Sequence, residues 1–134
     1  MPYTTELTED YLGIIQIGNG TVTGSEIVQG CRSVTALVQT TENFHYKLVD
    51  FTTARELRIT ERELAEIVEE DRRIARARPH AAVAIVAPND EMRAIAQYWE
   101  TLVEELGWST HVVPTRAEAL EWLREKLISA QVEY

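Results

Sequence analysis

The stretch Ala81–Ala87 reads Ala-Ala-Val-Ala-Ile-Val-Ala and is followed directly by Pro88, Asn89 and Asp90. An unbroken apolar run of this length is typical of a parallel strand that helices cover on both faces. The proline and the two polar turn formers after it end the strand and begin a helix. We therefore expect a buried strand here, in the middle of a parallel sheet, followed by a helix.

The segment after this strand has the clearest helical periodicity in the chain. Apolar residues recur every three or four positions over residues 92–106, as in a helix with one buried face. Gly107 then stands where a left-handed C-terminal cap is expected. A strand at residues 109–113 and a helix that begins after Thr115 complete this half of the chain. The apolar stripe predicted for that helix is Leu120, Leu123 and Leu127.

The N-terminal half alternates strands and helices in a similar way. The predicted strands are residues 3–7, 11–17 and 45–51. The first two are expected to form an opening hairpin, and Gly-Asn-Gly at residues 18–20 is expected to end its second strand. A threonine followed three residues later by glutamate has the spacing of a capping box, which predicts helix starts at Thr23 and Thr60.

The order of these elements predicts the fold class. Strands that alternate with single helices favour right-handed crossovers and a mainly parallel sheet, to which the first strand is attached antiparallel. The expected order is β-β-α-β-α-β-α-β-α. A chain of 134 residues is long enough for one well-buried core and short for two ordinary domains. We therefore expect residues 1–134 to form a single α/β domain.

Composition excludes several classes of partner. The chain has 13 basic and 22 acidic residues, a formal charge of −9, which repels nucleic acid and anionic lipid surfaces. No apolar run reaches the ~20 residues of a membrane-spanning helix, and the N-terminus lacks the features of a signal peptide. The single Cys31 cannot form an intramolecular disulfide. These features predict a cytoplasmic protein that neither binds nucleic acid nor spans a membrane.

Three segments carry a resemblance to a known family. Residues 47–67 read KLVDFTTARELRITERELAEI, residues 78–90 read RPHAAVAIVAPND, and residues 115–123 read TRAEALEWL. In this order the segments resemble the SpoIIAA-like family, whose relatives are the STAS domains and, more distantly, the SEC14-type lipid carriers. The resemblance implies a SpoIIAA-like fold with a five-stranded sheet. It also implies a protein partner or self-association.

The resemblance further implies one candidate modification site. STAS anti-sigma-factor antagonists carry an Asp-Ser-Ser-Gly-like string at the start of the second helix, where a serine is phosphorylated. Here the equivalent stretch reads Arg58-Ile59-Thr60-Glu61, without the glycine or the paired serines. Thr60 occupies the corresponding place and is therefore the candidate phosphorylation site.

Ligands of open α/β sheets bind beyond the carboxyl ends of the strands. The polar residues that this rule gathers are Asp50, Thr52, Thr53, Asn89, Asp90 and Thr115. They are the candidate ligand-binding residues. The alternative interpretation is that they cap helices and form turns, as such residues do in many folds of this kind.

No catalytic, metal or cofactor site is predicted. The histidines His45, His80 and His111 have no second ligand at the spacing of a metal site. Cys31 lies on the packing stripe of the first helix, where a small buried hydrophobe is expected rather than a nucleophile. The Gly-Asn-Gly sequence lacks the third glycine of a dinucleotide fingerprint, because Thr23 stands in its place.

Asp71 is an irregularity in this pattern. It falls on the apolar stripe of the second helix, where an unpaired carboxylate is costly. We expect it to lie half-exposed at the rim of the stripe, or else to face a second subunit.

Three functions remain open. The leading hypothesis is a non-enzymatic STAS-like regulatory or protein-interaction module, because the family resemblance is combined with a lack of catalytic motifs. The second is a carrier of a small apolar or lipid-like ligand, which the SEC14 kinship suggests. The third is a small enzyme with a site at the carboxyl ends of the strands.

Overall fold

The computed structural model describes residues 2–10, 12–40 and 44–132 and confirms the predicted order of elements. The strands are β1 (Tyr3–Leu7), β2 (Gly13–Thr23), β3 (Tyr46–Arg58), β4 (Ala82–Val86) and β5 (Ser109–Val113). The helices are α1 (Gly24–Thr40), α2 (Glu61–Ala77), α3 (Asp90–Val103) and α4 (Arg116–Val132), with a 3-10 turn, η1 (Glu104–Leu106), after α3. Tyr11, the predicted first residue of the second strand, lies outside the described residues.

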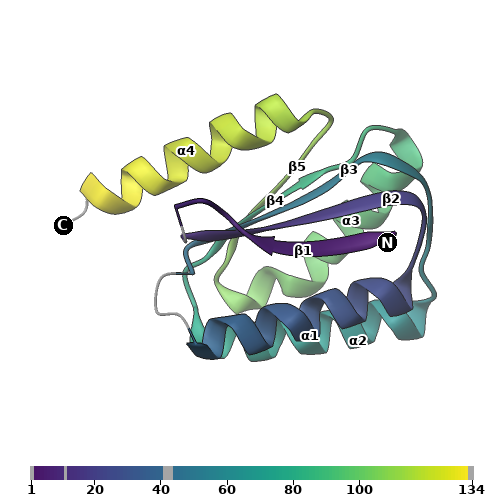
Figure 1. The fold of residues 1–134 in the computed structure, drawn as a ribbon, viewed down its shortest axis with the longest axis horizontal. Coiled ribbons are helices and arrows are strands. Elements are labelled where there is room, and N and C mark those ends of the chain that lie inside the picture. The colour runs from purple at the N-terminus through teal and green to yellow at the C-terminus, as the bar shows by residue number, and fades with distance from the viewer. Residues whose placement is uncertain (1, 11, 41–43, 133–134) are drawn as a thin grey trace.

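The five strands lie in the sheet in their order along the chain, β1-β2-β3-β4-β5. β1 pairs antiparallel with β2, and all later pairs are parallel, as predicted. Because β2, β3, β4 and β5 follow one another in the sheet, right-handed crossovers between them place the connecting helices on the same face of the sheet. Figure 1 shows α1 and α2 on one side of the sheet and α4 on the other. No strand follows α4, so the crossover rule does not place this helix.

Two strands are longer than the sequence analysis predicts. β2 runs through residues 18–20 and β3 runs on past Phe51, so both predicted strand ends were wrong. The parallel ladder between these two strands shifts register on either side of Gly20, whose φ is 62°. At each shift β3 contributes one residue more than β2, and the glycine on β2 opposite these bulges takes a left-handed conformation without strain.

Beyond the bulge, β2 and β3 pair with each other alone among the described strands. One face of this two-stranded extension is buried through Val22 and Leu57, which lie opposite each other. The residues around them are polar or small, so the segment has the composition of a turn and a link. The segment is a strand because it pairs with a neighbouring strand, and composition alone does not reveal that pairing.

β4 is buried along its whole length, as its apolar sequence predicts. Val83 and Ile85 face the main core beneath α1, α2 and α3, while Ala84 and Val86 belong to a second cluster beneath α4. The middle strand of the sheet is nevertheless β3, so the predicted central position of this strand was wrong by one place.

The helices begin where capping predicts, but the buried face of α4 differs from its predicted stripe. Thr23 and Thr60 form the predicted boxes with glutamates three residues later. On α4, Leu123 is buried as expected, whereas Leu120 is 44% exposed. Ala119, with no exposed surface, takes its place against the sheet. A small side chain at that position lets the helix lie close to the alanines of β4.

Candidate functional site

Asp50 is the most strongly bonded of the predicted ligand-binding residues. Its Oδ1 accepts the Thr52 backbone N–H at 2.8 Å and also the Thr52 hydroxyl. Its Oδ2 accepts from Arg116 Nη1 at 3.0 Å, and the carboxylate is almost fully buried. The ion pair therefore joins the middle strand to the first residue of α4. Sequence reasoning missed Arg116, because nothing in the sequence signals a partner 66 positions away.

Thr53 and Asp90 make contacts that do not include Asp50. The Thr53 hydroxyl donates to the Gly18 carbonyl at 3.1 Å and bonds to the Asn19 side chain on the neighbouring strand. Asp90, in the first turn of α3, pairs with Arg93 at 3.2 Å.

The remaining two candidates cap helices. Asn89 Oδ1 accepts the Met92 N–H at 2.9 Å at the start of α3, and Thr115 Oγ1 accepts the Glu118 N–H at 3.3 Å at the start of α4. The structure therefore joins Asp50 with Thr52 by hydrogen bonds, whereas each of the other four candidates has contacts that do not include Asp50.

Thr60 is exposed at the N-cap of α2. Its side chain accepts the Glu63 N–H at 3.1 Å, and the Glu63 carboxylate accepts the Thr60 N–H at 3.0 Å. This complete capping box is a structural reason for a threonine at position 60. Exposure keeps the hydroxyl accessible from outside.

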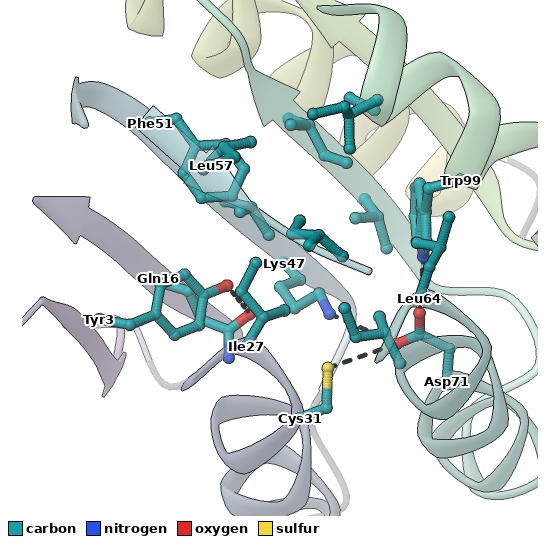
Figure 2. Close-up of a pocket in the computed structure, with 17 residues that line it drawn as sticks. Tyr3, Gln16, Ile27, Cys31, Lys47, Phe51, Leu57, Leu64, Asp71 and Trp99 are labelled. Atoms are coloured by element: carbon teal, nitrogen blue, oxygen red, sulfur yellow. Dashed lines mark hydrogen bonds and ion pairs between the residues drawn. The ribbon is translucent and has the colours of Figure 1, made fainter. Parts of the chain in front are cut away.

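The most unusual polar group of the molecule is Asp71, which has no exposed surface. The expectation that it lies half-exposed was wrong. Its Oδ2 accepts from Trp99 Nε1 at 2.8 Å, and its Oδ1 lies 3.7 Å from Lys47 Nζ and 4.0 Å from Cys31 Sγ. These partners come from α3, β3 and α1, so the cluster ties three helices to the sheet (Figure 2).

Burial governs the electrostatics of this cluster. It raises the pKa of Asp71, although Lys47 and the Trp99 hydrogen bond act in the opposite direction. Burial, followed by the charge of Asp71, raises the pKa of the Cys31 thiol to about 12. A thiol with such a pKa is not a nucleophile at neutral pH, which agrees with the predicted role of Cys31 as a buried hydrophobe.

Beside this cluster lies a cavity of about 60 Å³, between the sheet and α1, α2 and α3. Most of its walls are apolar, and Figure 2 shows Lys47, Asp71 and Cys31 at one end with Phe51 and Leu57 at the other. Sites for drug-sized ligands span roughly 300 to 1,000 Å³. The cavity is therefore too small for a lipid chain and large enough for a molecule of a few atoms.

A surface groove follows the seam where α2 meets α3 and η1; we call it the α2–α3 groove. It consists of three shallow hollows of about 370, 330 and 460 Å³, and each pair of hollows shares one residue: Arg72, Leu102 or Glu105. Its lining is Glu61, Leu64, Ala65, Val68, Glu69, Arg72, Ala75, Arg76, Tyr98, Thr101, Leu102, Glu104, Glu105 and Leu106. Tyr98 is 55% exposed there, the largest exposed fraction among the large hydrophobic residues that the structure describes.

Two other features are absent from residues 2–10, 12–40 and 44–132: a metal site and a membrane-spanning helix. No group of three or more His, Cys, Asp or Glu side chains in these ranges is arranged to hold a metal ion. None of the helices there combines the length and the apolar character needed to cross a membrane.

No family model and no curated protein matches the sequence. Solved structures do match the fold. The unphosphorylated anti-sigma factor antagonist SpoIIAA matches with a TM-score of 0.60 at 10% identity, over 91% of this chain and 97% of the other. The phosphorylated Bacillus cell fate determinant SpoIIAA matches with a TM-score of 0.57 at 11% identity, over 90% and 98% of the two chains.

A third match is an uncharacterised protein of the DUF3478 family from Shewanella loihica, described as having a SpoIIAA-like fold. Its TM-score is 0.58 at 13% identity, over 90% of this chain and 91% of the other. Likeness at such low identity concerns the fold, and it agrees with the resemblance seen in the sequence. The chain has the SpoIIAA-like fold, with four parallel strands and an antiparallel first strand.

Proposed function

We propose that this protein is a non-enzymatic regulatory module of the STAS type, which acts in the cytoplasm by binding another protein in the α2–α3 groove. The observation that carries the proposal is the exposed Tyr98 beside the half-buried Leu102 in that groove. Exposed aromatic side chains in apolar surroundings are typical anchors of protein interfaces.

The charge of the groove indicates the kind of partner. Glu61 and Glu69 line one of its sides, and Glu104 and Glu105 line the other. Arg72 bridges the two sides through ion pairs of 2.9 Å to Glu69 and 2.7 Å to Glu105. An amphipathic helix with apolar anchors and flanking basic residues fits this pattern. A second copy of a chain with a net charge of −9 is a less favourable partner.

Phosphorylation of Thr60 is the regulatory part of the proposal. Thr60 is the N-cap of α2 and directly precedes Glu61, at the end of the groove. A phosphate at this position gains from the positive end of the helix dipole and adds negative charge where a basic partner binds. Phosphorylation is therefore expected to strengthen binding of such a partner.

The test uses two matched positions. A photo-crosslinking amino acid is placed at Tyr98 in the groove, or at Leu120, an exposed residue of α4 on the other face of the sheet. Crosslinked proteins from the host are identified by mass spectrometry. The purified partner is then titrated calorimetrically against wild type, Tyr98→Arg and Leu120→Arg.

We expect Tyr98→Arg to weaken binding by about thirtyfold, as loss of an interface anchor of about 2 kcal/mol does. Leu120→Arg is expected to leave the affinity unchanged. Equal affinities of all three proteins would place the contact elsewhere. A crosslink from Tyr98 to a second copy of the chain would replace the proposed partner by self-association.

The alternative of a carrier for a lipid-like molecule has weaker support. The interior cavity of about 60 Å³ is several times smaller than an ordinary ligand site.

A further inference from the structure

The Lys47 side chain is an ammonium group inside the core. Lys47 is 3% exposed and lies on β3 between Ile14 and Val83, neither of which has exposed surface. Asp71, 3.7 Å away, is its charged partner, and the ring of Trp108 lies at 6.0 Å. An ammonium group has three N–H donors. Asp71 Oδ1, at 3.7 Å, is the acceptor that Lys47 Nζ faces, and it can take at most one of these three donors.

The other polar groups that line the cavity are already paired. The Tyr3 hydroxyl donates to Gln16 Oε1 at 3.0 Å, and Gln16 Nε2 donates to Thr5 at 3.1 Å. The Trp99 indole donates to Asp71 at 2.8 Å. Lys47 therefore supplies the free donors at this end of the cavity.

The remaining walls define the shape of what can enter. Val49, Ile67 and Ile85 are among the buried apolar side chains that line the cavity. Of its lining residues, Ile59 and Ile95 are the two that are half-exposed, so the lining reaches the surface between the start of α2 and α3. A volume of about 60 Å³ corresponds to roughly four to six water-sized positions.

We propose that this cavity is a binding site for a small neutral molecule with one oxygen that accepts a hydrogen bond from Lys47. Its apolar body of about four to six non-hydrogen atoms lies against the aliphatic walls. A small ketone has this chemistry. Lys47 and Asp71 together carry no net charge, so a neutral ligand introduces no unpaired charge into the core.

Cyclopentanone and cyclopentane are suitable probes, because they share a ring and differ in the acceptor oxygen. Binding to the full chain is followed by NMR titration of the Ile67 and Ile85 methyl groups and the Trp99 indole N–H. We expect saturable shifts for cyclopentanone and an affinity about tenfold higher than for cyclopentane, as one charge-assisted hydrogen bond provides.

A triple variant, Lys47→Met with Asp71→Leu and Trp99→Phe, removes both charges and also the indole N–H that would otherwise lose its acceptor Asp71. In this variant the two probes are expected to bind equally. Equal binding to the wild-type protein would overturn the proposal without any variant, because the lysine would then play no part. Tighter binding of butyrate than of cyclopentanone would also overturn it, since the site would then select anions.

Discussion

At the scale of single residues, the buried pair of Lys47 and Asp71 is the feature that most needs a physical explanation. Transfer of two charges out of water is costly, and removal of one partner alone leaves the other unpaired. The hydrogen bond from Trp99 and the ion pair with Lys47 together offset part of the cost of burying the Asp71 carboxylate in the core. Such a cluster supplies specificity of packing more readily than it supplies stability.

The raised pKa of Asp71 leads to a prediction about pH. Because burial raises this pKa above its usual value of 3.8, the native state holds the proton to higher pH than the unfolded state does. The resulting contribution to stability is fully present below about pH 3.8 and is lost as the pH rises through the raised pKa.

The variant Asp71→Asn has no carboxyl group to titrate. We expect the free energy of unfolding of wild type, minus that of the variant, to fall between about pH 4 and about pH 7. Urea unfolding of both proteins at the two pH values measures this difference. A difference that increases with pH would mean that attraction by Lys47 outweighs burial.

At the scale of elements, the extension of β2 and β3 beyond the rest of the sheet follows two register shifts and includes one left-handed backbone conformation. Gly20, on β2 opposite the bulges of β3, has a φ of 62°, and a Cβ added there would meet no atom within 4 Å. Any cost of substitution therefore comes from the backbone and not from a clash.

We expect Gly20→Ala to lower the free energy of unfolding by about 1 to 2 kcal/mol, because an L-residue is strained in the left-handed region. Gly20→Asn is the matched control and is expected to cost less, since asparagine tolerates this conformation. Urea unfolding of the wild type and the two variants measures these differences in the free energy of unfolding. Equal stability of all three would show that the bulge relaxes without strain.

At the scale of the whole molecule, helices on both faces close the sheet. The larger core lies beneath α1, α2 and α3, whereas α4 alone covers a smaller cluster that includes Leu48, Ala84 and Leu123. The Arg116–Asp50 ion pair fixes the start of α4 at the middle strand. The second face therefore depends on one helix.

Two leucines of α4 test this arrangement. Leu123 is 3% exposed and Leu120 is 44% exposed. We expect Leu123→Ala to lower the free energy of unfolding by about 2 to 4 kcal/mol, through lost burial and the cavity left behind. Leu120→Ala is expected to cost less than about 0.5 kcal/mol. Thermal and urea unfolding measure both, and a reversed order would mean that α4 packs through its other face.

The sequence by itself determined the order of elements, the residues at which the helices begin, and which strands pair parallel and which antiparallel. The apolar run at residues 81–87, the capping boxes at Thr23 and Thr60, and the glycine cap at position 107 are local signals. Local signals of this kind depend on backbone hydrogen bonds and periodic burial within one segment. They require no knowledge of which distant residues are neighbours, which is why these predictions held.

The tertiary structure alone decided the features that depend on distant neighbours. Pairing beyond the bulge lengthened β2 and β3, and close packing on the alanines of β4 chose Ala119 over Leu120. The burial of Asp71 required Lys47 and Trp99, which lie 24 and 28 positions away along the chain. A carboxylate is stable in the core when such partners surround it, and only the folded chain brings them together.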